Sequence, residues 1–187
     1  MPLPARFSQN LLRRFRRNSR GSAAVEFALI APLFFGLVFA IVETAMIFFA
    51  GQVLETVTQD SARAIMTGQA QNGLVTGCST PCTQAQFKTY VCSQISALFD
   101  CTNGIYIDVR SYTASQFGSV NLTPPIDSGG NFLPAMQYST GGAGNIVVVR
   151  LFYQWPLFVT SLGFNVANLN TGKRLLTATA AFKNEPF

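Results

Sequence analysis

The sequence of 187 residues has room for one ordinary domain and an anchoring segment. It carries a formal net charge of +5, but six of its thirteen basic residues precede Gly21, where no acidic residue occurs. The remaining basic and acidic side chains nearly cancel, which argues against nucleic-acid binding by the folded part. Histidine, the commonest general base and metal ligand, is absent, which handicaps the usual enzymatic chemistry without excluding it. We expect a protein that is not an enzyme, with no cofactor, no metal and no small-molecule substrate.

Residues 1–21 are predicted to form a cationic cytoplasmic leader. The arginines nearest to the apolar stretch that follows are Arg13, Arg14, Arg16, Arg17 and Arg20. Beyond that stretch, the near flank has only Arg63. Because positive residues stay on the cytoplasmic side of a membrane, the amino terminus is expected inside and the remainder outside.

Residues 22–50 are predicted to span a membrane. No charged residue occurs from Phe27 to Val42, and Glu43 is the sole ionisable residue before Ala50. Counted from Phe27, these roughly 24 residues would form a helix of about 36 Å, enough to cross a bilayer with some tilt. A secretory signal peptide is the alternative, but its apolar region takes only about 7 to 15 residues. We therefore expect a permanent single-pass anchor.

Residues 51–68 are predicted to continue the same helix outside the membrane. Apolar and small residues recur there at helical spacing and form one stripe: Val53 or Leu54, Val57, Ser61 or Ala62, and Ile65. Gly68 is the predicted end of the helix. The stripe needs a cover, which is either the sheet of the same domain or a partner subunit.

Residues 69–187 are predicted to form a periplasmic α+β domain. Apolar residues at helical spacing predict a second, shorter helix over 85–100. Strands are predicted over 104–112, 145–155 and 175–183, and the middle one is apolar enough on both faces to be central. The expected fold is therefore α+β, a long N-terminal transmembrane and amphipathic helix packed on a small, mostly antiparallel sheet, with a second short helix.

Two regions of this domain have less regular patterns. The strand at 104–112 alternates apolar residues with Tyr106, Asp108 and Arg110, which is typical of a strand with one face in the core and one face half-exposed. Residues 114–144 are rich in Ser, Gly, Pro and Asn, so we expect an irregular excursion with a short strand near Phe132 or Met136. The Gly-rich stretches within it lack the Lys-Ser/Thr pair of a phosphate loop.

The four cysteines all follow the apolar segment, which suits an oxidising compartment. A bridge from Cys92 to Cys101 would fix the turn after the second helix, and a bridge from Cys78 to Cys82 would close a small loop. These pairings are favoured among the three that four cysteines allow. A four-cysteine zinc site is the alternative, although the spacing departs from the close pairs that such sites use.

A carboxylate stands just inside the apolar segment, at Glu26, five positions after Gly21. Burying such a group costs a few kcal/mol at mid-bilayer and less near the interface, so it needs a compensating partner or a position at the membrane surface. If the chain were cut after Gly21, the new amino group of Ser22 would lie within about one helical turn of Glu26. The carboxylate also suits the positive end of the helix dipole.

This sequence resembles the TadE-like pseudopilins of the tight-adherence, or Flp-type, pilus system of bacteria. The resemblance rests on R-G-S-A-A-V-E-F-A-L-I-A-P-L from Arg20, on I-V-E-T around Glu43, and on Q-D-S-A-R-A from Gln59. Ser22 stands where ordinary type IV and type II secretion pseudopilins usually have Phe or Met, which favours the tight-adherence branch.

The resemblance implies a pilin-like minor pilin that is processed and assembled. A prepilin peptidase would cleave between Gly21 and Ser22. The product would lie in the bacterial inner membrane, with its outer domain in the periplasm, or enter the pilus. Its partners would be membrane lipid, the pilus platform proteins, the major Flp pilin and other minor pilins. Glu26 would serve charge pairing during assembly, and Glu43 is either an intersubunit contact or an interfacial residue.

A function of a different class is the alternative. A single-span, membrane-anchored periplasmic ligand-binding or sensor module would share the anchor and the outer domain. In that case the excursion at 114–144 would hold the ligand, and the amino terminus would stay uncleaved.

Overall fold

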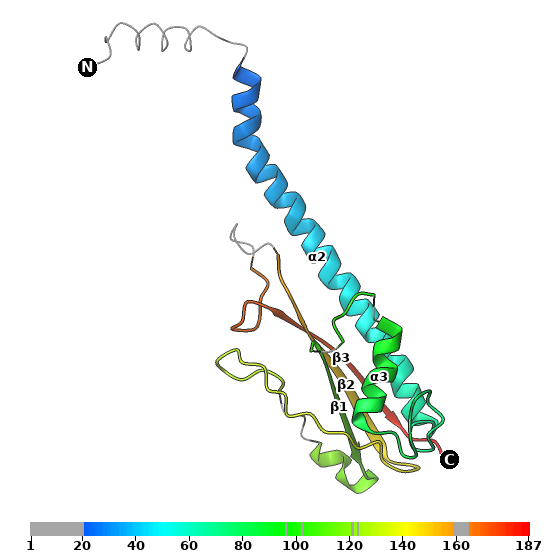
Figure 1. Cartoon of the computed structure of the whole chain (residues 1–187). Coiled ribbons are helices and arrows are strands. Elements are labelled where there is room, and N and C mark those ends of the chain that lie inside the picture. The colour runs from blue at the N-terminus through cyan, green and yellow to red at the C-terminus, as the bar shows by residue number, and fades with distance from the viewer. Residues whose placement is uncertain (1–20, 96, 102, 121, 123, 159–164) are drawn as a thin grey trace, which may run out of the picture. The chain divides into compact units, whose positions relative to one another are not determined.

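A computed structural model of the chain describes residues 21–187 except 96, 102, 121, 123 and 159–164. The elements in chain order are α2 (Ser22–Met66), α3 (Gln84–Ile95), β1 (Ile105–Tyr112), the 3-10 helix η2 (Ala114–Ser119), β2 (Ile146–Trp155) and β3 (Arg174–Lys183) (Figure 1). The predicted α+β class with a long N-terminal helix is confirmed. The chain divides between Val42 and Glu43 into two compact units, which are described separately.

The sheet of the second unit has three antiparallel strands in the order β1-β2-β3. The predicted central strand is confirmed, since β2 pairs along its whole length with β3 and buries nearly all of its residues. The predicted closing strand is β3, one residue longer at its start. Its open edge is flanked by Arg174 and Lys183, charged residues of the kind that discourage edge-to-edge pairing.

One face of the sheet carries the main core. The part of α2 that follows Glu43 lies on this face together with α3 (Figure 1). The predicted stripe of α2 is buried, with Leu54 and Ile65 at 0% exposure. Because these side chains pack in one cluster with Val149 and Leu151 of β2, the cover of the stripe is the sheet of the same chain, the first of the two alternatives.

The helix α2 ends where the sequence placed a glycine. Gly68 has a φ of +75°, a left-handed conformation that residues with a side chain rarely adopt. A side chain there would also collide with the ring of Phe187, whose Cγ lies 2.4 Å from the site of an added Cβ. The carboxyl-terminal residues therefore cover the end of α2, and the N–H of Glu185 donates to the carbonyl of Met66 (2.9 Å).

The other face of the sheet is also covered, and here the expectation for β1 was wrong. Asp108 is fully buried and Arg110 is 9% exposed, although both were expected on a half-exposed face. The cover is a second apolar cluster in which Phe132 and Met136 of the excursion pack against Phe152. The polar positions Asp108 and Arg110 of β1 are therefore buried charged residues and do not face solvent.

The excursion and the second helix differ from prediction in detail. Residues 114–144 contain η2 and isolated bridges, among them Ile126 with Phe132, but no strand near Phe132 or Met136 among the described residues. The helix α3 ends at Ile95, five residues before the predicted end. Leu98 and Phe99 follow the helical spacing, but they lie in the turn that leads to β1.

Candidate functional site

The first turn of α2 holds the residues of the predicted processing and pairing site. Ser22 is the first residue of the helix and Glu26 lies one turn later. The hydroxyl of Ser22 donates to Oε1 of Glu26 at 3.0 Å, and both side chains are exposed. The carboxylate of Glu26 therefore reaches back to the residue that would become the new amino terminus.

Gly21 precedes the helix and has no neighbour that would demand glycine. An added Cβ would meet nothing within 4 Å, and its backbone does not adopt the positive φ that favours glycine. In contrast to Gly68, Gly21 is not required by the fold. A requirement for glycine there would have to come from a molecule that handles this peptide.

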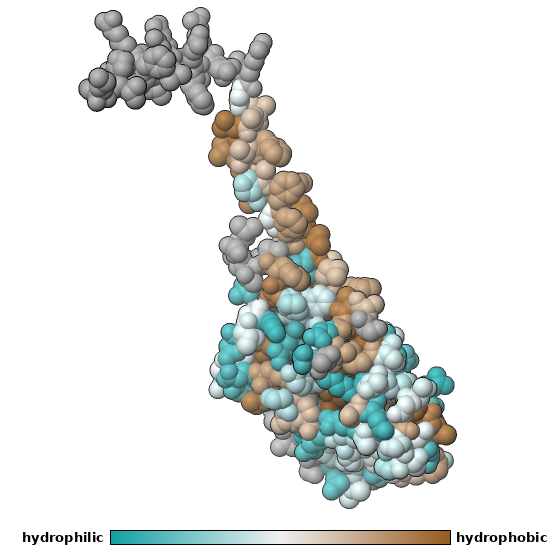
Figure 2. Space-filling model, viewed as in Figure 1, coloured by the Kyte–Doolittle hydropathy of each residue, from teal (hydrophilic) through white to brown (hydrophobic). Residues whose placement is uncertain are grey.

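The helix beyond Glu26 is apolar and exposed on all sides. From Val25 to Val42 its large apolar side chains, apart from the half-buried Val38, are 47–78% exposed. They include the consecutive residues Leu33, Phe34 and Phe35, which point in three directions about 100° apart. In Figure 2 this part of α2 is mostly brown, the colour of hydrophobic residues. A helix in a water-soluble core buries one stripe, whereas this surface is typical of a helix in lipid.

Among the described residues, α2 is the one helix long and apolar enough to cross a membrane. By length and composition it fits a single-pass membrane anchor. A signal sequence meets the same criterion. However, α2 continues without interruption to Met66, and its last part lies in the core of the outer domain.

Glu43 faces its own domain. It is 5% exposed, and one carboxylate oxygen accepts a hydrogen bond from the backbone N–H of Phe158, in the connection after β2. It continues the buried stripe of Ile47, Ala50 and Leu54 by one turn. Glu43 was expected to be either an intersubunit contact or an interfacial residue. Neither expectation included a hydrogen bond within the chain.

The arginines expected to set the topology lie outside the described residues. These are Arg13, Arg14, Arg16, Arg17 and Arg20. Their assignment to the cytoplasmic side remains a prediction from the positive-inside rule.

The cysteines form the two pairs that spacing favoured. Cys78 bonds to Cys82, and Cys92 bonds to Cys101. All four are therefore disulfide-bonded, which leaves no thiolate for the alternative zinc site. The second bond ties α3 to the turn that leads into β1.

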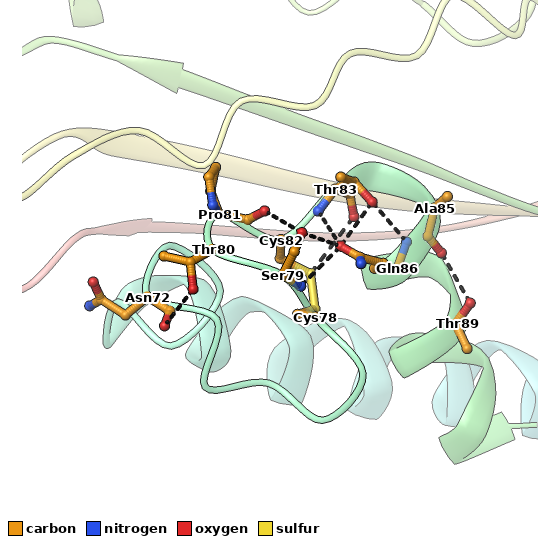
Figure 3. The surroundings of a disulfide bond; sticks show 10 residues. All are labelled: Asn72, Cys78, Ser79, Thr80, Pro81, Cys82, Thr83, Ala85, Gln86 and Thr89. Atoms are coloured by element: carbon orange, nitrogen blue, oxygen red, sulfur yellow. Dashed lines mark hydrogen bonds between the residues drawn. A yellow bond between two sulfur atoms is a disulfide. The ribbon is translucent and has the colours of Figure 1, made fainter.

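A polar network surrounds the first disulfide (Figure 3). Oε1 of Gln86 accepts hydrogen bonds from the backbone and the hydroxyl of Ser79, at 3.2 and 2.9 Å. It also accepts from the backbone N–H and the hydroxyl of Thr83, each at 3.0 Å. The N–H of Gln86 donates in return to the Thr83 hydroxyl at 3.3 Å, so the two residues form a capping box at the start of α3.

Sequence reasoning missed a buried charge cluster on the sheet. Asp108 on β1 lies directly opposite Arg150 on β2, and Nη2 of Arg150 donates to the carboxylate at 2.6 Å. Nε of Arg110 donates to the same carboxylate at 3.0 Å, and the N–H of Gln137 donates to it at 2.8 Å. The lone arginine within the apolar run of β2 was the sequence signal that could have indicated this cluster.

Residues 21–63 match the model of the family described as TadE-like protein. Comparisons with curated proteins and with solved structures gave no match. The matched residues include Gly21, Glu26, the exposed apolar stretch and Glu43, and they end three residues before the end of α2. This N-terminal segment is therefore similar to TadE-like proteins, as the motif that begins at Arg20 predicted.

Proposed function

We propose that this chain is a minor pilin of a tight-adherence pilus, made as a precursor that a prepilin peptidase cleaves after Gly21. The observation that carries the proposal is an exposed carboxylate, Glu26, in contact with Ser22 at the start of a helix with apolar residues exposed on every side. The TadE-like match of the same segment supports it. The chain acts in assembly, and its chemical event is to be a substrate.

Cleavage changes the charge at the start of the helix. Water hydrolyses the peptide bond, which leaves a carboxylate on Gly21 and an amino group on Ser22. An α-amino group has a pKa of about 8, so it is mostly protonated at neutral pH. A cation is thereby created within one turn of Glu26, where the Ser22 hydroxyl already reaches the carboxylate.

The mature helix then carries a cation and an anion at its apolar end. In low dielectric an unpaired charge is costly, so each group is best satisfied by an opposite charge. The pair forms within one subunit in the membrane. In a packed fibre, Glu26 of one subunit pairs with the amino group of its neighbour, which sets the register between adjacent helices.

Partners and location follow from this proposal. The platform proteins, the major Flp pilin and other minor pilins contact the exposed helix surface in place of lipid. The leader lies in the cytoplasm, and the domain after the anchor lies in the periplasm of a bacterium. Extramembrane disulfides agree with that oxidising compartment.

The alternative of a ligand-binding module gains little from the excursion. Its middle part lies against the sheet, with Phe132 and Met136 packed in the second cluster and Gln137 bonded to Asp108. A groove of about 430 Å³ lies elsewhere, between the end of α2 and β3, with Arg63 and Glu185 among its lining residues. The middle of the excursion therefore covers one face of the sheet and does not form the ligand pocket that this alternative needs.

The assembly role is tested by replacing Glu26. The Glu26→Ala chain should lose its leader as the wild type does and yet support no pili, because the new amino group has no carboxylate to pair with. Glu26→Gln keeps an acceptor for the Ser22 hydroxyl without the charge, and it should fail as well. Mass spectrometry of the membrane fraction measures cleavage, and electron microscopy counts pili.

A matched control is Glu55→Ala, which removes a glutamate from the same helix beyond the apolar stretch. Glu55 accepts a long hydrogen bond from Gln59 (3.4 Å) on the helix surface. This variant should be processed and should form pili. Normal pili in the Glu26→Ala strain would remove the pairing role.

A further inference from the structure

A second segment of this chain is exposed and apolar, the start of the connection between β2 and β3. Phe158 is 80% exposed, more than any other large apolar side chain described. Leu157 beside it is partly buried against the main core. In the sequence, no charged residue occurs between Arg150 and Lys173. Charged side chains are costly in lipid, so the absence of charge suits contact with an apolar medium.

The position of Phe158 is fixed from two sides. Trp155, at the end of β2, is 6% exposed and packs edge-on against Phe99 and Tyr153. Three extended residues reach at most about 10 Å, so Phe158 cannot move far from this strand end. Its backbone N–H also donates to the carboxylate of Glu43 on α2.

Glu43 sets the depth of this contact relative to the membrane. The hydrocarbon core of a bilayer takes about 20 helical residues, which counted from Phe27 reach Met46. The hydrogen bond therefore holds Phe158 beside the last turn of these 20 residues. On the helix surface near Glu43, Met46, Phe48 and Phe49 are 41–70% exposed and continue the apolar surface.

We propose that Phe158 forms a second membrane contact, with its side chain in the boundary between lipid headgroups and acyl chains. This inference rests on the membrane anchorage in the proposed function. Glu43 is the positioning residue, because its carboxylate holds the Phe158 backbone against α2. The outer domain is thereby fixed close to the bilayer at two points, the helix and the loop.

Lipid is the expected partner because Phe158 is held beside the turn of α2 that carries Glu43, and the apolar side chains of Met46, Phe48 and Phe49 are exposed just after it. A carboxylate at this depth would be costly if it were bare, and the backbone N–H of Phe158 supplies a charge-assisted hydrogen bond. Each group satisfies the other, so the loop can enter the boundary without an unpaired carboxylate.

Tryptophan fluorescence in vesicles tests the contact. Trp155 is the one tryptophan of the chain, so Trp155→Phe provides a background without tryptophan. In that background, the full chain receives Phe158→Trp, Phe187→Trp or Phe35→Trp and is reconstituted in phosphatidylcholine and phosphatidylglycerol vesicles with brominated acyl chains. Bromine quenches a tryptophan that touches the lipid.

The two controls carry the same Phe→Trp substitution at positions that differ in their expected distance from lipid. Phe35 is 47% exposed within the predicted span. Phe187 is 46% exposed and lies beside Gly68, just beyond the carboxyl end of α2. Because Met66 follows Glu43 by about 35 Å of helix, a tryptophan at 187 should be far from lipid. The variant at 158 should be quenched as strongly as that at 35 and several-fold more than that at 187.

Each of the other possible results of the quenching experiment would contradict a different part of the proposal. Quenching at 35 without quenching at 158 would overturn the loop contact and leave the anchor intact. A blue-shifted but unquenched tryptophan at 158 would mean that protein covers it, which also overturns the lipid contact. Absence of quenching at 35 would overturn the anchor, and the proposed function with it.

The role of Glu43 is tested in the same assay. Glu43→Gln keeps an oxygen acceptor for the Phe158 N–H and should retain most of the quenching at 158. Glu43→Ala removes the acceptor and should reduce quenching at 158 several-fold, with quenching at 35 unchanged. Equal quenching at 158 in both variants would remove Glu43 from the proposal.

Discussion

At the residue scale, Asp108 determines whether the buried charge cluster is stable. Its carboxylate accepts hydrogen bonds from two guanidinium groups, on Arg110 and Arg150, and all three side chains are buried. Arg150 also lies over the ring of Phe152, with its guanidinium carbon 5.3 Å from the ring centroid. The carboxylate thus compensates positive charge in a place with little access to water.

We expect Asp108→Asn to destabilise the chain by about 3 to 5 kcal/mol, because two buried guanidinium groups would lose their anionic partner. Chemical denaturation of the full chain in detergent measures the free energy of unfolding. The exposed Asp60 provides the control, since Asp60→Asn should change that free energy by less than about 0.5 kcal/mol. Equal stability of the two variants would contradict the account of the cluster.

Tyr138 gives a prediction about alkaline pH. Burial raises its pKa from 10.0 to about 12, and its hydroxyl has no hydrogen-bond partner among the described residues. A raised pKa in the folded state means that stability is complete below pH 10 and falls as the pH rises from there towards 12.

Tyr138→Phe removes a buried hydroxyl that makes no bond, so at pH 7 we expect unchanged or slightly increased stability. Between about pH 10 and 12 the variant should lose less stability than the wild type, because it has no phenol to ionise. Unfolding curves at neutral and alkaline pH measure both effects. A variant with the same alkaline loss as the wild type would show that other groups are responsible.

At the element scale, the start of α3 depends on its capping box. The Thr83 hydroxyl accepts from the N–H of Gln86 and the Gln86 side chain accepts from the N–H of Thr83, so two backbone donors at the helix start are satisfied. The same Gln86 side chain bonds Ser79 in the first disulfide loop. The cap therefore joins the loop to the helix.

Thr83→Ala should cost about 1 kcal/mol of stability, the usual effect of removing an N-terminal cap. Thr89→Ala is the matched control, because the Thr89 hydroxyl bonds the carbonyl of Ala85 within the same helix and alanine favours helix more. This control should be neutral or stabilising. The cap would lose its assigned role if both variants had the same free energy of unfolding.

The elements were predictable where one periodicity dominated. The stripe of α2 predicted only a helix and the apolar run of β2 only a central strand, and both were confirmed. The end of α3 was not, because Leu98 and Phe99 keep helical spacing although the chain turns there towards β1 and the disulfide partner Cys101. The spacing of apolar residues indicates which side chains are buried. Because a turn can bury such side chains as well as a helix can, the spacing did not show where α3 ends.

Long-range contacts explain the remaining differences. Asp108 looks solvent-exposed in the sequence of β1, but its partner Arg150 lies 42 residues later. The hydrogen bond from Phe158 to Glu43 spans 115 residues. No local pattern contains such pairs, so the sequence indicated that Glu43 was unusual without indicating what it contacts.

At the scale of the whole molecule, the helix α2 has two kinds of surface. Before Glu43 most large apolar side chains of α2 are exposed, and from Ile47 onward one stripe is buried against the sheet. The sequence predicted both parts because they differ in charge content as well as in periodicity. The disulfides and the closed sheet faces then hold the second unit together.

The central claim is that this chain is a precursor whose mature form begins at Ser22, and the intact mass of the membrane-bound protein tests it most directly. In cells with the prepilin peptidase, the mass should fall by that of residues 1–21, and in cells without the peptidase it should not. The fold leaves space for a side chain at position 21, but we expect the peptidase site to accept only glycine there, so Gly21→Leu should retain the leader even with the peptidase present. Ser22→Ala, the control next to it, should still be cleaved. An amino terminus that is intact in both kinds of cell would contradict the account.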